Sequence, residues 1–93
     1  MYAVVRRYKG ATALIDELAQ REQVVREILQ GVPGFAAYYL VRSADGGASI
    51  TVCQDQAGTA ESSKRAADWI RQNLPDVTGA TPEITEGEVL YNF

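Results

Sequence analysis

The stretch YYLVRSADGGASITV, Tyr38 to Val52, decides the fold because it is typical of a β-hairpin whose strands carry apolar residues on both faces. Asp45-Gly46 is a strong signal for a two-residue turn, since both positions tolerate positive φ. The sequence therefore predicts two paired strands, roughly residues 35–42 and 48–54.

Side chains alternate between the two faces of a strand, so the hairpin divides into two apolar sets. Tyr39 and Val41 share one face with Ile50 and Val52, and Tyr38 and Leu40 share the other with Thr51 and Cys53. Apolar patches larger than a few hundred Å² usually mark an interface. One set needs a cover from outside the chain's own helices, and a second copy of the chain is the simplest one. The sequence leaves open which set meets it.

The rest of the chain supplies two helices and two more strands. The segment 2–8 is rich in β-branched and aromatic residues, and the segment 84–93 carries apolar residues at alternate positions. A helix is predicted from Thr12 to residue 30, with an apolar stripe of Leu14, Leu18, Val25, Ile28 and Leu29. Thr59 is expected to cap a second helix that ends at Pro75 and whose stripe is Ser63, Ala67, Ile70 and Leu74. A polar loop over 76–83 then leads to the last strand.

The predicted order is βαββαβ in a single domain over residues 1–93. This order matches the ferredoxin-like α+β arrangement, in which four strands form an antiparallel sheet and both helices pack on one face. The other face is then free to pair with a second subunit, so we expect a homodimer.

Composition excludes several classes of function. A net charge of -3 and a pI near 4.8 argue against a nucleic-acid partner. No apolar run is long enough to cross a bilayer and no signal peptide is evident, so we expect a cytoplasmic protein without a membrane partner. The chain has no histidine and one cysteine, Cys53, so the common zinc and iron ligand sets cannot be assembled and no metal site is expected.

The sequence resembles the dimeric α+β barrel superfamily, and within it the small antibiotic-biosynthesis-monooxygenase-like proteins. The resemblance rests on the element order, on VPGFAAYYLVR at the entry to the hairpin, on ESSKRAADWIRQNL in the second helix and on the terminal TPEITEGEVLYNF. It implies a barrel of two sheets meeting face to face, with a pocket in each subunit between sheet and helices. Members include cofactor-free oxygenases of polycyclic phenols and haem-degrading enzymes. The haem-degrading members use a histidine as the haem ligand, and this chain has no histidine.

The resemblance implies a pocket in which Asn, Trp, Tyr and Arg side chains hold a phenolate-like substrate. Trp69 and Asn73, four residues apart on the second helix, have the right chemistry for its wall, and the alternative is that Trp69 is a core anchor. Tyr38 and Tyr39 point to opposite faces, so at most one of them lines the pocket, and ordinary burial is the alternative for each.

Arg6 and Arg7 also lie on opposite faces of the first strand, so one of them can point inward and attract an anionic or enolate ligand. Solvation at the strand end is the alternative. Glu86 and Glu88 have the spacing of a carboxylate pair, but charges on an edge strand more often discourage aggregation, and Gly87 between them suggests a bulge. Cys53 is predicted to be a small core residue.

Two classes of function fit these observations. The first is a monooxygenase-like protein that acts on or binds a small aromatic or hydrophobic molecule without a cofactor, with Trp69, Asn73, Tyr38, Tyr39 and Arg6 as candidate pocket residues. The second is a non-catalytic ligand-binding or assembly module in which the same aromatic residues only pack. The sequence identifies no catalytic residue.

Overall fold

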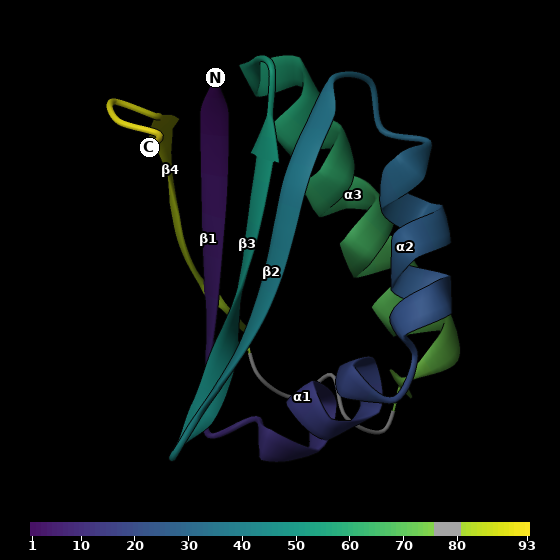
Figure 1. Cartoon of the computed structure of the whole chain (residues 1–93). Coiled ribbons are helices and arrows are strands. Elements are labelled where there is room, and N and C mark those ends of the chain that lie inside the picture. The colour runs from purple at the N-terminus through teal and green to yellow at the C-terminus, as the bar shows by residue number, and fades with distance from the viewer. Residues whose placement is uncertain (76–80) are drawn as a thin grey trace.

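A four-stranded antiparallel sheet with helices on one face forms the molecule (Figure 1), as the sequence predicts. The computed structural model describes residues 1–75 and 81–93. The elements, in chain order, are β1 (Tyr2–Lys9), α1 (Thr12–Ala19), α2 (Glu22–Gln30), β2 (Phe35–Ser43), β3 (Gly46–Cys53), α3 (Gln56–Asn73) and β4 (Glu83–Glu88). The strand order across the sheet is β2-β3-β1-β4, which is the ferredoxin-like order. Most of the predicted loop over 76–83 lies outside the described residues.

The single helix predicted over residues 12–30 is wrong, because the chain breaks it into α1 and α2 at Gln20 and Arg21. Arg21 has φ -121° and ψ 41°, which is outside the helical region. In Figure 1, α1 lies across one end of the sheet and α2 turns to run beside β2. No glycine or proline marks the break in the sequence, and it lets the chain change direction between α1 and α2.

The hairpin turn is one residue earlier than predicted. Ser43 pairs with Gly46, so Ala44 and Asp45 form the two-residue loop and Gly46 begins β3. Gly46 has φ 147°, and a Cβ there would lie 2.0 Å from the carbonyl oxygen of Tyr8. Glycine is needed at this position for its positive φ and for the close approach of β1.

The third helix also begins earlier than predicted. Its N-cap is Asp55, whose carboxylate accepts a hydrogen bond from the backbone N–H of Gly58 at 3.1 Å. Thr59, the predicted cap, is fully buried one turn further on. A Cβ on Gly58 would lie 2.7 Å from the Cβ of Cys53, so the first turn of α3 is packed closely against β3.

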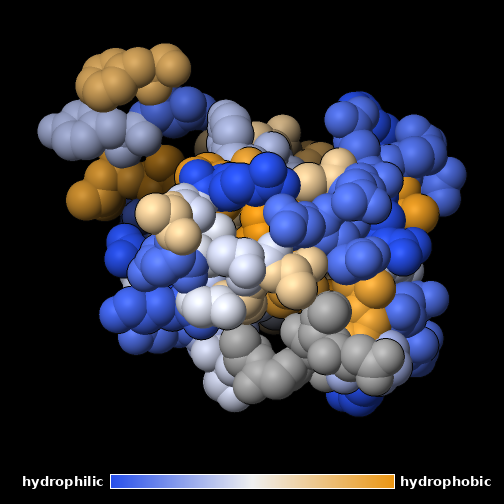
Figure 2. All heavy atoms as spheres, turned by 90° about the horizontal axis from the view of Figure 1, so that it is seen from below, coloured by the Kyte–Doolittle hydropathy of each residue, from blue (hydrophilic) through white to orange (hydrophobic). Residues whose placement is uncertain are grey.

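The last strand ends at Glu88, five residues before the predicted end. The β1–β4 register runs from Tyr2↔Glu88 to Arg7↔Glu83 without a shift, so the bulge suggested at Gly87 is not present. Beyond the strand, Tyr91 and Phe93 stack on each other at 5.7 Å between ring centroids and are exposed. Figure 2 shows hydrophobic atoms projecting at one corner of the molecule.

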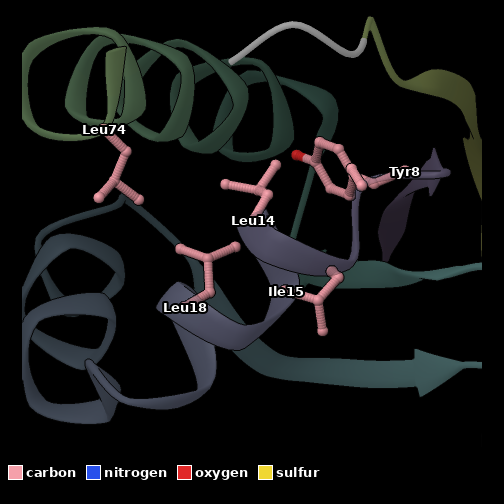
Figure 3. Close-up of a cluster of buried hydrophobic side chains, with 6 residues drawn as sticks. Tyr8, Leu14, Ile15, Leu18 and Leu74 are labelled. Carbon is pink, nitrogen blue, oxygen red and sulfur yellow. The ribbon is translucent and has the colours of Figure 1, made fainter. Parts of the chain in front are cut away.

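The hydrophobic core lies between the sheet and the helices. One cluster joins Tyr8 on β1 with α1 and with the residue that follows α3; its buried members are Tyr8, Ala11, Leu14, Ile15, Leu18 and Leu74. Figure 3 shows Leu14 pointing toward Tyr8, and Leu74 entering from the end of α3. A second cluster contains Leu29, Val32 and Cys53, so Cys53 is a core residue as predicted.

The helices cover the hairpin face that carries Tyr38, Leu40 and Cys53. The opposite face has no cover from the described residues, and there Tyr39 and Val41 are 57% and 46% exposed. Val5 and Ile50 lie beside them and are half-buried. The structure thus decides which of the two apolar sets is left open.

Candidate functional site

A buried arginine lies at the centre of the candidate site. Along β1 the inward positions are Val4, Arg6 and Tyr8, because alternate residues of a strand share one face. Arg6 is only 4% exposed, whereas Arg7 on the other face is exposed. Arg6 is therefore the inward arginine that the sequence predicted, and solvation at the strand end does not describe it.

Four hydroxyl groups surround the guanidinium of Arg6. Its Nη1 donates to Ser49 Oγ and Thr51 Oγ1 on β3, both at 3.4 Å. Its Nη2 donates to Ser62 Oγ at 3.2 Å and to Ser63 Oγ at 2.6 Å on α3. Within residues 1–75 and 81–93, no carboxylate lies within 4.0 Å of this guanidinium. In the part of the chain that the structure describes, the side-chain groups that accept hydrogen bonds from Arg6 are all neutral hydroxyls.

A short polar chain leads from this group to β4. Ser62 Oγ donates to the Thr59 carbonyl oxygen at 2.8 Å, and Thr59 Oγ1 lies 3.1 Å from Glu86 Oε2. Glu86 is exposed but lies on the helix-covered face of β4, opposite Val4 in the register. It anchors the start of α3 to the edge strand, and this is a role that the sequence did not suggest for it.

A small cavity of about 40 Å³ adjoins Arg6 between the sheet, α2 and α3. Its polar lining comes from the strands and its apolar lining from the helices; the residues are Arg6, Tyr8, Ser49, Thr51, Tyr38, Leu18, Val25, Ile28, Leu29, Ala66, Trp69 and Ile70. About one water molecule fits a space of this size. A larger ligand would require its walls to move.

A groove of about 460 Å³ lies next to this cavity, between α2 and the edge strand β2. Four residues line both spaces and form the wall between them: Leu18, Val25, Leu29 and Tyr38. Phe35 and Leu40 add apolar surface to the groove, while Glu22 and Arg26, an ion pair at 3.2 Å, lie among its lining residues. The volume falls within the range of small-molecule sites.

The two tyrosines that line the cavity, Tyr8 and Tyr38, are neutral phenols at neutral pH. Burial raises the pKa of Tyr8 and of Tyr38 above the ordinary 10.0, and the positive charge of Arg6 opposes part of this effect. Ser49, beside both phenols, lowers each pKa by a smaller amount. Both hydroxyls therefore keep their protons and can donate to a ligand.

Trp69 is half-buried, lines the small cavity and packs against the core cluster of Tyr8 and Leu14. The Arg21 guanidinium lies 5.8 Å from its ring centroid and also pairs with Glu17 at 3.1 Å. Trp69 thus serves packing and lines the cavity at the same time. The contact also holds the break between α1 and α2 against α3.

Asn73 is not brought to the cavity. It is exposed, lines neither space, and its side-chain amide donates to the Trp69 carbonyl oxygen at 2.9 Å near the end of α3.

The apolar stripe predicted for α3 is displaced at one position: Ala67 is exposed, whereas Ala66 lines the cavity. Ala67 is turned outward because α3 packs on the sheet through its small buried residues Gly58, Thr59 and Ser62.

Tyr38 lines both spaces, and Tyr39 lies on the open face of the sheet. Burial raises the pKa of the Cys53 thiol, with the nearby Asp55 carboxylate adding to the effect, so this fully buried group is a poor nucleophile.

Among the described residues, no group of three or more histidine, cysteine, aspartate or glutamate side chains could hold a metal ion. No helix in the same part of the chain is long and apolar enough to span a membrane.

The hydroxyl residues around Arg6 were missed by the sequence interpretation. Ser49 and Thr51 stand on the inward face of β3, where an apolar residue is the usual choice, and Ser62 and Ser63 are adjacent on α3. A run of small polar residues on faces that must be buried was the available signal, because buried polar groups need partners.

Solved structures with this arrangement cover almost the whole chain. A protein of unknown function from Nitrosomonas europaea, NE2512, has a TM-score of 0.75 at 17% identity, covering 99% of this chain and 91% of that one. A variant of SnoaB, a cofactor-independent oxygenase from Streptomyces nogalater, has a TM-score of 0.60 at 16% identity, covering 98% and 92%.

MhuD from Mycobacterium tuberculosis is a third similar structure. A variant of it with two manganese protoporphyrin IX molecules per active site has a TM-score of 0.71 at 19% identity, covering 100% of this chain and 98% of that one. This chain has the same fold. The ferredoxin-like α+β fold that the sequence predicted is thus shared with these proteins. No family model matches the sequence, and no curated protein matches it.

Proposed function

We propose that this protein binds a small aromatic molecule between α2 and the sheet and promotes its oxygenation without a cofactor. The observation that carries the proposal is the groove of about 460 Å³, which shares a wall with a cavity lined by Trp69, Tyr8 and Tyr38. The fold it shares with a cofactor-independent oxygenase supports the reaction class by analogy.

An aromatic ring fits this site for physical reasons. The groove offers apolar side chains of α2 and β2, and the shared wall of Leu18, Val25, Leu29 and Tyr38 consists of side chains that change rotamer without breaking a backbone hydrogen bond. Burial of apolar surface contributes about 25 cal/mol per Å². A ligand that displaces this wall would place one end beside Trp69.

The reaction proposed is oxidation of a phenol to a quinone. The substrate loses two hydrogen atoms and gains one oxygen atom from O2, and the second oxygen atom leaves as water. A carbon–hydrogen bond and the phenolic O–H bond break, and a new carbon–oxygen bond forms. The electrons come from the substrate itself, so no separate reductant is needed.

An oxygen electrode with a 1-naphthol substrate tests the reaction, and quenching of the fluorescence of the only tryptophan, Trp69, tests binding. We expect saturable quenching and consumption of one O2 per quinone formed. Val25→Phe, which fills the shared wall without adding a second tryptophan, should abolish both, whereas Lys64→Ala on the exposed side of α3 should change neither. Binding without O2 uptake would reject the oxygenase and favour a non-catalytic binding module. Absence of quenching would reject the site.

We further propose that two copies pair through the open face of the sheet. Tyr39 and Val41 are exposed there, and large apolar side chains gathered on one face usually mark an interface. Light scattering should give twice the chain mass of 10.1 kDa. Val41→Glu should give the mass of one chain, while the matched change Ala67→Glu on exposed α3 surface should not. A wild-type mass of one chain at micromolar concentration would contradict the pairing.

A further inference from the structure

The strand pattern of the sequence continues past the end of β4. Val89, Tyr91 and Phe93 stand at alternate positions, and in a strand such residues share one face. Among the described residues, the last backbone hydrogen bond along this edge runs from the Val89 N–H to the Met1 carbonyl oxygen, at 2.9 Å. Both rings are at least 79% exposed. The segment 89–93 therefore has the pattern of a strand and no strand of its own chain beside it.

The outer edge of β2 is the complementary feature. The strand order is β2-β3-β1-β4, so no strand of the described chain pairs with this edge. The run Phe35–Val41 along it contains no charged residue and no proline, although such residues usually protect an exposed edge from pairing. The groove of about 460 Å³ follows the same edge, and because the sheet ends at β2, no further strand of the described chain closes the groove on that side.

We propose that the segment 89–93 of one copy lies along the outer edge of β2 in a second copy, where Tyr91 and Phe93 form the missing wall of the groove. The added strand supplies hydrogen-bond partners for the free edge. Tyr91 and Phe93 already stack at 5.7 Å between ring centroids, so both rings lie on one side of the segment. The inference deepens the proposed function and rests on it for the role of the groove, because the ligand site is then incomplete without the partner.

The segment at this position must come from a second copy. Figure 1 shows β4 and the C-terminal end on one side of β1, and β3 and β2 on the other. Neighbouring strands lie about 4.8 Å apart, so a strand outside β2 lies about 19 Å from β4. Five extended residues span at most about 18 Å, and the segment would still have to turn and run along β2. Two copies related by a two-fold axis can each give and receive one segment, which leaves neither edge unpaired.

The area available is sufficient for a stable pair. An aromatic side chain buries about 150 to 250 Å², so the two rings of each copy together bury about 600 to 1,000 Å² in a reciprocal exchange. The groove and edge surfaces that they cover lose a similar area from water, and the total then reaches the roughly 1,200 to 2,000 Å² of a stable interface. The exchange adds to the pairing proposed for the open face of the sheet.

Hydrogen exchange of the β2 amides tests the docking without any ligand. In the wild type the amides along the outer edge of β2 should be protected. In a double variant, Tyr91→Ser with Phe93→Ser, they should exchange at least about tenfold faster, because the loss of two ring contacts makes local opening easier. The matched control Ile84→Ser removes an exposed apolar side chain of β4 outside the segment and should leave the exchange unchanged. Fast exchange in the wild type, or equal protection in the double variant, would overturn the docking.

A nitroxide label on Asn92→Cys tests whether the segment comes from a second copy. The native Cys53 is fully buried and does not compete for the label. In a mixture with wild type that carries nitrogen-15, the label should broaden the wild-type amide signals of Phe35–Val41 beyond detection. The same label on Lys64→Cys, on the exposed side of α3, is the control and should leave these signals sharp. Sharp β2 signals with the Asn92 label would overturn the exchange, and this result does not depend on the folding of the double variant.

Binding of 1-naphthol separates this inference from the proposed function. The double variant should bind it at least about tenfold more weakly than the wild type, as measured by quenching of Trp69, because contacts between rings are lost. Equal affinity in the two proteins would overturn the aromatic wall. A wild type with a protected β2 edge and no quenching would overturn the proposed function and support the docking.

Discussion

Replacement of Arg6 by methionine should leave the free protein about as stable as the wild type. Arg6 is 4% exposed and its hydrogen-bond partners are neutral hydroxyls, so its removal leaves no orphaned charge behind. A buried arginine that held a structural carboxylate would behave in the opposite way, because removal of one ion strands the other at a cost of about 3 to 5 kcal/mol.

The expected magnitude follows from the contacts of Arg6. The two bonds to α3, of 3.2 and 2.6 Å, are strong enough to count, and hydrogen bonds to charged groups contribute about 1.5 to 3 kcal/mol each. Against their loss stand the several kcal/mol of desolvation that a buried ion suffers and about 1.5 to 3 kcal/mol gained by burying the methionine side chain. The buried hydroxyls that lose Arg6 as a partner add a further cost, so the opposing terms nearly cancel and we expect the free energy of unfolding to change by less than about 2 kcal/mol.

Urea unfolding followed by Trp69 fluorescence measures this change, and light scattering of the same samples establishes whether the subunits are paired. Arg71→Met, which removes an exposed ion pair with Asp68, is the matched control and should alter the free energy of unfolding by less than about 1 kcal/mol. A loss of more than about 2 kcal/mol in Arg6→Met would refute the reasoning, since it would mean that the buried guanidinium stabilises the fold by more than its desolvation costs.

Three further predictions concern the groups around the site. Burial raises the folded-state pKa of Tyr8 and Tyr38 above 10.0, so their contribution to stability is complete below pH 10 and is lost as the pH rises through the raised values. In an absorbance titration at 295 nm, Tyr8→Phe and Tyr38→Phe should each remove one late-ionising phenol. Unchanged titration curves would contradict the pKa shifts. Asp55→Ala should lower the free energy of unfolding by about 1 kcal/mol through loss of the α3 cap, as measured in urea, and an unchanged value would reject the cap. Gly58→Ala should destabilise by about 1 to 3 kcal/mol in the same assay, because the new Cβ would lie 2.6 Å from a carbonyl oxygen; Gly87→Ala, with nothing within 4 Å, is the control, and equal effects would contradict the close packing.

The strands and their order could be predicted because their signals are local. Runs of β-branched and aromatic residues bounded by glycine and proline mark β1, β2 and β3. Side chains alternate along each strand, so the sequence assigns them to two faces without showing what packs on either face. The inward arginine and the core position of Cys53 follow from the same period of two. The helix boundaries were harder to predict. No breaker residue marks the division at Arg21, and Asp55 and Thr59 are both residue types that cap helices, so the sequence did not decide between them.

At the candidate site, the sequence determined the direction of some side chains, and the tertiary structure determined what they contact. By itself the sequence determined that one arginine of the first strand points inward, because a strand has two faces and the two arginines are adjacent. Only the tertiary structure decided what surrounds it, since Ser49 and Ser62 come from elements 43 and 56 residues away in the chain. It also decided that Asn73 turns to solvent and that Tyr39, rather than Tyr38, lies on the open face. The period of a helix or strand fixes which side chains travel together, and only packing between distant segments fixes what they meet.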